Sequence, residues 1–320
     1  MLKKVPFSVF VLSSFAILAC CVSTICGRIR YVYHAAPDSD GFANHMNSLQ
    51  NAAIFARRLG NCDLVIVKGG GKFCDQLDCS RFGLYSGVRI LTEQPPNAQV
   101  VHLEVCSDCD TLERLTAFFS TSHADAVEGT GNRAWFSLGQ GKTVLEQQWF
   151  WDHWQPTAKY SLKAMEKLAS LGLTTYMYVA SHVRSISCHR AFKGEENFPG
   201  AHLAMWRACE RNASTTREMT NFFNVSHLPL LACSDNKAES KARVRELEDK
   251  LGATPCATGG YGKLAPYVVD IVLLSEARLF LGTKVSTFSL LVQNIRDARA
   301  RREGVSALRK YPSVTTWPLP

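Results

Sequence analysis

The sequence contains no internal repeat, no low-complexity block and no long run of basic residues. The first two absences argue against solenoid and disordered chains and leave an ordinary globular protein, with 46% hydrophobic and 20% charged residues. The lack of a long basic run matters because the net charge of the chain is +8. Unclustered positive charge fits an anionic ligand better than nucleic acid, so we expect no nucleic-acid partner. A length of 320 residues favours two domains over one.

The N-terminal segment, residues 1–27, carries no charge after Lys4. Lys3 and Lys4 precede an apolar stretch, which is typical of a secretory signal or a signal-anchor. The stretch is longer than an ordinary signal core and barely long enough to span a bilayer. A cleaved signal and a type II anchor both remain open, and membrane contact is expected only for the anchor. In either case the rest of the chain faces the lumen of the endoplasmic reticulum or Golgi.

Two sequons agree with this compartment. Asn212-Ala-Ser214 and Asn224-Val-Ser226 match the acceptor pattern for N-glycosylation, which takes place only in the secretory pathway. The chain is therefore expected to be a glycoprotein.

The cysteines also suit an oxidising lumen. Cys106-x-x-Cys109 could be half of a zinc site or a redox pair, but no second CxxC or nearby His pair completes it. Most cysteines are therefore expected in disulfides, and an odd number leaves at least one unpaired. The nine that follow residue 27 are Cys62, Cys74, Cys79, Cys106, Cys109, Cys188, Cys209, Cys233 and Cys256.

Hydrophobic periodicity predicts an α/β fold in two halves. In the first half a strand at 29–36, a turn at 37–41, a helix at 44–59 and a strand at 62–70 form a βαβ unit, which builds parallel sheets. Residues 69–155 are hard to parse. From residue 158 a second series begins, with helices at 158–172, 238–252 and 285–300 and strands at 174–184 and 227–235. Residues 267–283 predict a helix that leads into a short strand.

We therefore predict two Rossmann-like domains, at residues 28–155 and 156–300, followed by a basic tail at 301–320. Two such halves that face each other would leave a cleft at the carboxyl ends of their strands, where open α/β sheets bind ligands.

Polar residues gather at the predicted strand ends. Alternation along the strand places His182 and Arg184 on the same face, although a core histidine and an interdomain ion pair are simpler explanations. Ser286 and Thr287 begin a helix and are N-cap candidates. Asp270 could cap its own helix, and Asp40 lies in an ordinary turn sequence.

Three stretches taken together resemble the GDP-fucose-dependent fucosyltransferases, most closely the protein O-fucosyltransferase group, whose two facing Rossmann-like halves form the GT-B arrangement. Their order and spacing carry the resemblance, which extends from about Arg30 to Arg296, with a poor match in the cysteine-rich middle. The matching residues are Gly41, Phe42 and Asn44 in the first stretch, His182 and Arg184 in the second, and Asp270, Gly282, Ser286, Thr287 and Phe288 in the third.

The resemblance implies a catalytic role for three residues. Arg184 would donate to the diphosphate as its negative charge grows, because guanidinium forks onto phosphate oxygens and stays protonated. Asn44 would lie near the fucose and the acceptor hydroxyl. Asp40 would be the general base, because inversion at the anomeric carbon needs a group that takes the acceptor proton.

The resemblance also implies a donor pocket in the second domain, with the first domain on the acceptor side. Ser286 and Thr287 would hold the diphosphate at a helix N-terminus, Phe288 would lie near the base, and Asp270 would accept from guanine. The residues expected to bind GDP-fucose are Gly41, Phe42, His182, Asp270, Ser286, Thr287 and Phe288.

Asp38-Ser-Asp40 raises the alternative of a metal-binding DxD motif, as in GT-A glycosyltransferases. This pair comes too soon after the leader, because the nucleotide-binding strands of a GT-A fold should precede it. Arg184 and a helix N-terminus could neutralise phosphate instead. We predict metal independence and no bound cofactor.

The sequence thus predicts an inverting fucosyltransferase that moves L-fucose from GDP-fucose to a hydroxyl of a protein Ser/Thr or a glycan. One alternative is an α1,6- or α1,2-type glycan fucosyltransferase. The other is an inactive lumenal binding protein on the same scaffold. The latter gains some support from Ser185-Ile-Ser187, which stands where many fucosyltransferases have a second Arg and an acid.

Overall fold

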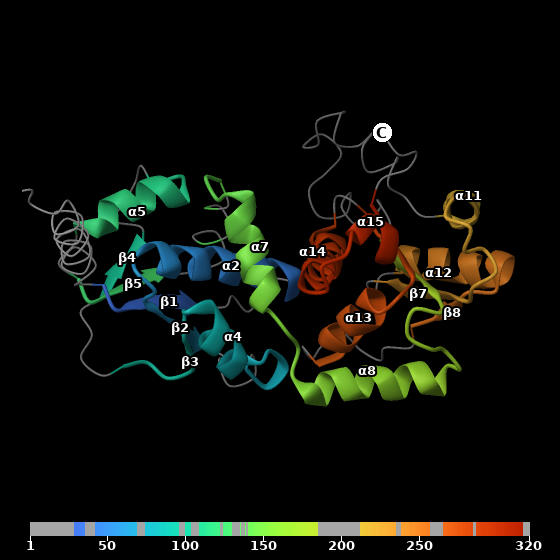
Figure 1. Cartoon of the computed structure of the whole chain (residues 1–320), viewed down its shortest axis with the longest axis horizontal. Helices are drawn as coiled ribbons and strands as arrows, with labels where there is room; N and C mark the ends of the chain where they lie inside the picture. The colour runs from blue at the N-terminus through green and yellow to red at the C-terminus, as the bar shows by residue number, and fades with distance from the viewer. Residues whose placement is uncertain are drawn as a thin grey trace, which may run out of the picture. The chain divides into compact units, whose positions relative to one another are not determined.

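The structure, a computed structural model, describes residues 29–35, 42–68, 74–95, 100–103, 109–121, 124–129, 135, 138, 140–184, 212–234, 238–256, 265–283 and 286–315. The chain divides into two compact units, each with its own sheet (Figure 1). The first unit comprises Met1–Asp40, Asn47–Gly71 and Cys79–Gln147, and the second comprises Gly41–Met46, Lys72–Asp78 and Gln148–Pro320.

The first unit contains a five-stranded sheet in the order β3-β2-β1-β5-β4, and all its pairings are parallel. The predicted strand, helix and second strand are confirmed as β1, α2 and β2. The stretch that periodicity could not parse supplies the rest of the unit. The bounds are β1 Tyr31–Ala35, α2 Phe42–Arg58, β2 Asp63–Lys68, α4 Cys79–Ser86, β3 Ile90–Leu91, β4 Val100–His102, α5 Leu112–Ser120, β5 Ala126–Gly129 and α7 Val144–His153. The start of α2 and the part of α7 after Gln147 belong to the second unit.

Helix α2 forms because its apolar residues recur at helical spacing and its small residues allow close packing. Leu49, Ala52, Ala53, Phe55 and Ala56 are all buried. Since strands buried on both faces need cover on each side, this helix supplies part of the apolar surface for the first sheet.

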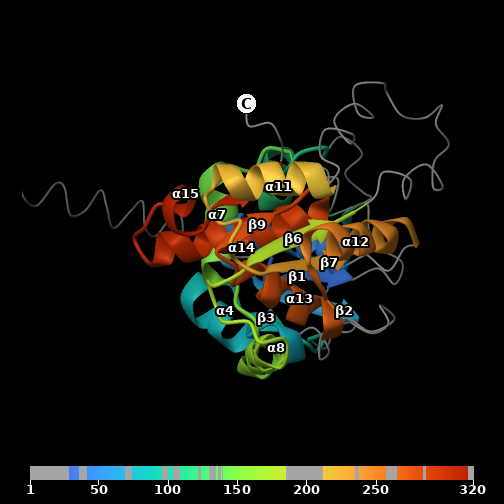
Figure 2. The ribbon, with the colours of Figure 1, turned by 90° about the vertical axis from the view of Figure 1, so that its right-hand side faces the viewer.

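The second unit contains another five-stranded parallel sheet, in the order β10-β9-β6-β7-β8. Helices lie on both faces of this sheet (Figure 2), and α8 packs along α13. The bounds are α8 Ala158–Ser170, β6 Val179–Val183, α11 Ala213–Phe222, β7 Leu230–Ser234, α12 Ala238–Leu251, β8 Thr254–Pro255, α13 Ala265–Ser275, β9 Leu279–Leu281, α14 Thr287–Arg302, α15 Ala307–Lys310 and β10 Ser313–Val314.

The strand order reverses next to β6. The chain adds β7 and β8 on one side of β6, then crosses over and adds β9 and β10 on the other side. Such a reversal leaves a crevice outside the carboxyl ends of β6 and β9, which is where open α/β sheets bind ligands.

Two predicted boundaries differ from the structure. Residues 148–155 and the first turn of α2 cluster with the second unit, whereas we placed them in the first domain. The segment predicted as a separate basic tail belongs to the second unit. Over 301–315 it contains the end of α14, all of α15 and β10, which pairs with β9 in the register Ser313↔Phe280. The basic residues of this segment suggested an exposed tail, but Tyr311 and Val314 are buried in the second unit.

No helix among the described residues is both long and apolar enough to cross a bilayer; the predicted signal or anchor, residues 1–27, lies outside them.

Helix α14 is held at its middle by Arg296, which is fully buried. Its guanidinium donates to the carbonyl oxygens of Ser275 at 2.8 Å, Ala277 at 2.7 Å and Pro312 at 3.2 Å, and to Ser313 Oγ at 3.1 Å. Burial lowers the pKa of Arg296 to about 10, so it stays charged at neutral pH. One side chain thus joins the end of α13, the start of β9 and the start of β10.

Replacing Arg296 with Met should lower the free energy of unfolding by about 3–5 kcal/mol, because several buried carbonyls lose their donor at once. Urea denaturation measures this loss. Arg309→Met, at an exposed position of α15, is the matched control and should change stability by no more than about 0.5 kcal/mol. An equal effect of both variants would show that Arg296 does not organise this corner of the unit.

Candidate active site

Three backbone segments meet at the carboxyl edge of the second sheet through one hydroxyl. His182, near the end of β6, places Nδ1 at 2.8 Å from Ser289 Oγ in the first turn of α14. The same oxygen accepts a hydrogen bond from the backbone N–H of Thr283, just after β9, at 2.9 Å. His182 is 5% exposed and Ser289 is fully buried. The ends of β6 and β9 and the start of α14 are therefore tied together at the strand-order reversal.

A glycine permits this approach. A Cβ on Gly282 would lie 2.9 Å from Ser289 Cβ and 2.8 Å from the ring of Phe280. Contacts this short are not tolerated, so a larger residue would push α14 away from β9. Gly282, which we selected from the resemblance to fucosyltransferases, thus has a packing role in this structure.

His182 is neutral at physiological pH. Burial, and secondarily the positive charge of Arg184, lower its pKa to about 3. Ser289 Oγ accepts from Thr283 and keeps its own proton, and when it donates that proton to His182 Nδ1, the imidazole hydrogen lies on Nε2. His182 therefore offers an N–H donor without adding a charge.

The N-terminus of α14 has the properties of an anion site. A helix start leaves backbone N–H groups unpaired and carries partial positive charge. Ser286 is the N-cap residue, yet its side chain makes no capping bond. The hydroxyls of Ser286 and Thr283 are buried and have no hydrogen-bond partner among the described residues. Buried hydroxyls are normally paired, so these two donors are suited to a bound ligand.

Aromatic rings continue from His182 in a row. The ring centroid of Phe288 lies 4.8 Å from His182 and 6.4 Å from Tyr267 of α13. Tyr267 in turn stacks on Phe42, at 6.2 Å and an interplanar angle of 6°. Residues predicted from three separate stretches are thus brought together, because the first turn of α2 belongs to the same unit.

Asp270 lies one turn after Tyr267 on α13 and is 2% exposed. Its carboxylate lies within 4.8 Å of the sulfurs of Cys233 and Cys256, which form a disulfide between the ends of β7 and β8. Sulfurs bonded to each other are not thiolate ligands, so this group is poorly suited to a metal. Asp270 instead supplies a buried carboxylate beside an apolar disulfide.

The other cysteines that the structure describes agree with an oxidised protein. Cys74, Cys79 and Cys109 are disulfide-bonded, whereas the buried thiol of Cys62 donates to the carbonyl of Ile29 at 2.8 Å. The prediction of several disulfides with a cysteine left over is confirmed.

Of the remaining residues predicted for the site, three lie among the described residues and two lie outside them. Asn44 lies in the first turn of α2, where its Oδ1 is buried and has no hydrogen-bond partner among the described residues, and Arg184 directly follows β6. Asp40 and Gly41 lie outside the described residues, so their predicted roles stay predictions. Thr287 is half-buried at the start of α14.

Sequence reasoning missed Tyr267, Thr283 and Ser289. A signal existed for two of them. Ser289 comes three residues after Ser286, and Tyr267 lies three residues before Asp270, so each shares a helix face with a residue that we selected. Nothing in the sequence distinguished Thr283, whose role depends on its backbone N–H.

Comparison with known proteins gives matches in structure only. No protein-family model and no curated protein sequence matches the chain. POFUT1 in complex with GDP superposes with a TM-score of 0.61 at 13% identity, over 90% of this chain and 99% of POFUT1. The fucosyltransferase NodZ from Bradyrhizobium gives a TM-score of 0.51 at 14% identity, over 84% of this chain and 92% of NodZ. The chain has the GT-B-type fold of these fucosyltransferases. The predicted fold class, an α/β protein of two Rossmann-like units, is confirmed.

Stability should depend on pH through His182. Its pKa is depressed in the folded protein, so the unfolded chain binds a proton that the folded one does not as pH falls from about 6.5 towards 3. This group alone removes up to about 1.4 kcal/mol of unfolding free energy per pH unit in that window. His182→Asn should show a shallower slope between pH 6.5 and 4.5 in urea titrations. A slope equal to that of the unmodified protein would contradict a neutral buried His182.

Proposed function

We propose that the chain is an inverting fucosyltransferase that transfers L-fucose from GDP-fucose to a hydroxyl on a protein Ser/Thr or a glycan. The carrying observation is the group of His182, Ser289 and the α14 N-terminus at the strand-order reversal of the second sheet. The fold supports it, since POFUT1 in complex with GDP-fucose superposes with a TM-score of 0.59 at 12% identity.

The diphosphate is assigned to the N-terminus of α14. Its negative charge suits the unpaired amides and the hydroxyl of Ser286. As the bond between the anomeric carbon and the β-phosphate oxygen breaks, charge grows on that oxygen. Arg184 is the donor assigned to it, because guanidinium stays protonated and forks onto phosphate. His182 adds an Nε2–H donor and no second positive charge.

Guanine is assigned to the region of Asp270. A carboxylate can accept from both the N1–H and the 2-amino group, a pair of donors that uracil lacks. The rings of Phe288 and Tyr267 provide flat apolar surface close by. Ser286 follows Asp270 by sixteen positions in the sequence. Asp270 lies beside the Cys233–Cys256 disulfide at the carboxyl ends of β7 and β8, and Ser286 follows the carboxyl end of β9, so both lie at the same edge of the sheet.

For the acceptor side we propose the two residues that the family resemblance implies, Asp40 and Asn44. Asp40 would take the proton from the acceptor hydroxyl, and Asn44 would orient the sugar or that hydroxyl. The reaction needs no metal in this scheme, because Arg184 and the helix terminus neutralise the leaving phosphate. We place the protein in the secretory lumen, in keeping with its disulfides.

Two alternatives share the donor site. A glycan acceptor in place of a polypeptide is consistent with the NodZ α1,6-fucosyltransferase co-crystallized with GDP, which has a TM-score of 0.52 at 14% identity. A lumenal binding protein without turnover is favoured only by Ser185, which stands where many fucosyltransferases have a second Arg.

Calorimetric titration of the secreted chain with its disulfides intact tests the donor assignment. GDP and GDP-fucose should bind in EDTA, and UDP should bind at least about tenfold more weakly, a difference of about 1.4 kcal/mol. Equal binding of GDP and UDP would contradict the role of Asp270. Lack of binding to all three would contradict the proposed function, and binding only after Mn²⁺ is added would contradict metal independence.

Arg184→Ala should reduce kcat for fucose transfer by about 10²–10³-fold, because a donor aimed at the leaving oxygen acts mainly in the transition state. Transfer of radiolabelled fucose to polypeptide and oligosaccharide acceptors measures this loss and identifies the acceptor class. Arg184→Lys should recover part of the rate, and Arg309→Ala should leave it unchanged. Full activity of Arg184→Ala would contradict the mechanism.

A further inference from the structure

The two sequons lie at opposite ends of one helix. α11 begins directly after Asn212 and ends shortly before Asn224. Both asparagines thus lie in the second unit and flank the same helix, yet their local structures differ. This difference allows the modified site to be assigned.

The first sequon is engaged in starting the helix. Asn212 Oδ1 accepts from the N–H of Thr215 at 2.9 Å, and Thr215 Oγ1 accepts from the N–H of Asn212 at 3.2 Å, which completes a capping box. The sequon hydroxyl, on Ser214, lies inside the first turn and donates to Glu218 Oε1 at 3.2 Å. Both functional groups of this sequon are therefore held by the folded helix.

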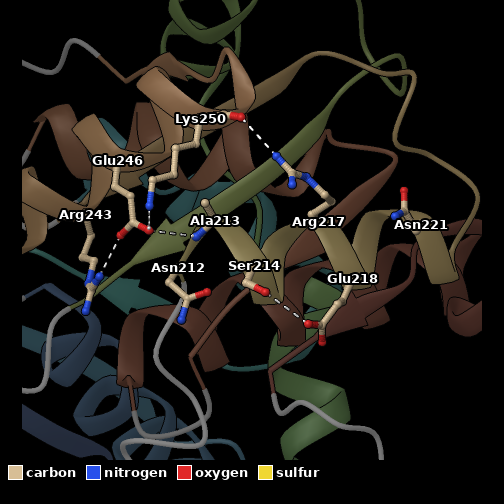
Figure 3. A pocket seen from close by; sticks show the side chains of 9 residues that line it. All are labelled: Asn212, Ala213, Ser214, Arg217, Glu218, Asn221, Arg243, Glu246 and Lys250. Carbon is tan, nitrogen blue, oxygen red and sulfur yellow. Dashed lines mark hydrogen bonds and ion pairs between the residues drawn. The ribbon is translucent and has the colours of Figure 1, made fainter.

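The surroundings of Asn212 reinforce this arrangement. It borders a hollow of about 490 Å³ between α11 and α12 (Figure 3). Glu246 in this hollow accepts from the N–H of Ala213 at 3.5 Å, and pairs with Arg243 at 2.7 Å and Lys250 at 3.3 Å. The start of α11 is thus fixed to α12 by a charged network in addition to its own cap.

The second sequon lies beyond the end of the helix. The N–H of Asn224 donates to Asn221 O at 2.9 Å, and the N–H of Val225 donates to Thr220 O at 2.8 Å. This pair of bonds is a Schellman motif, in which Asn224 adopts the left-handed conformation with φ 52°. Val225 is buried, whereas the side chains of Asn224 and Ser226 are exposed. The helix end therefore uses the backbone of this sequon and leaves both reacting side chains in solvent.

An exposed aromatic ring precedes the second sequon. Phe222, two residues before Asn224, is 65% exposed. Its neighbour Phe223 packs against the hydrophobic core of the second unit. The rings of Phe222 and Phe223 lie edge to face, with their centroids 5.2 Å apart. The C–H groups on one face of a sugar ring are slightly positive and pack well on the negative face of an aromatic ring. Phe222 thus offers a platform for a sugar attached at Asn224.

We propose that Asn224 carries an N-linked glycan whose first N-acetylglucosamine covers Phe222, and that Asn212 remains unmodified. The donor is a lipid-linked oligosaccharide pyrophosphate, used by the oligosaccharyltransferase of the host. The bond from the sugar C1 to the pyrophosphate oxygen breaks, a bond from C1 to Asn224 Nδ2 forms, the amide loses one proton, and the lipid pyrophosphate leaves. The assignment does not depend on the enzymatic activity proposed above.

Site occupancy is the first test. The full chain is expressed in cultured eukaryotic cells and treated with peptide N-glycosidase F in H₂¹⁸O, which converts a glycosylated Asn into labelled Asp. We expect the label at Asn224 only, loss of the glycan mass shift in Asn224→Gln, and no change of that shift in Asn212→Gln. An unlabelled Asn224, or a label at Asn212, would overturn the proposal.

The role of Phe222 is measured separately. The Tm of the glycosylated protein should exceed that of the enzymatically deglycosylated protein by about 2 °C, and this difference should persist in Phe222→Tyr and vanish in Phe222→Ala. Since deglycosylation makes the same Asn-to-Asp change in all three proteins, comparing the differences isolates the ring. An unchanged difference in Phe222→Ala would show that the sugar does not cover the ring.

Discussion

The hydroxyl of Ser289 is the point on which the candidate site depends. It accepts from the backbone of Thr283 and pairs with the imidazole of His182, so it links two strands and a helix in a region from which water is excluded. Buried polar groups without partners are costly, and in this triad each group satisfies another. The arrangement in turn requires Gly282, because any side chain there would occupy the space that Ser289 fills.

Helix α14 is anchored a second time, two turns further on, by Arg296. This guanidinium binds backbone carbonyls at the end of α13 and at the start of β10, well away from the strand-order reversal. With two anchors the helix direction is set, and so is the direction in which its N-terminal amides point. An anion at that terminus would then meet donors that are already oriented, which is the physical basis of electrostatic preorganisation. The structural role of Arg296 and the proposed anion-binding role therefore lie at different positions along one helix, the first at its middle and the second at its N-terminus.

Much of the fold could be predicted from periodicity, and the failures have physical causes. The apolar stripe of α2 and the buried strand β6 have unambiguous patterns. β3 and β8 contain two residues each, too short for any alternation to be recognised. We interpreted the segment that contains β10 as a basic tail, because it begins with several arginines and lysines and its two buried apolar residues, Tyr311 and Val314, come only after them. Short strands form when a sheet already exists for them to join, so their signal lies outside their own sequence.

The same distinction applies to the site. Strand-end residues such as His182 and Arg184, and helix-start residues such as Ser286, could be selected from sequence because secondary structure places them at the ligand-binding edge of a parallel sheet. The neutral state of His182, the row of rings from Phe42 to Phe288 and the part played by Ser289 could not, since each arises from contacts between residues far apart in the chain. The periodicity of a segment shows which of its faces is apolar. The burial and hydrogen bonding of a side chain depend on which other segments pack against it, and this is decided only when the chain folds.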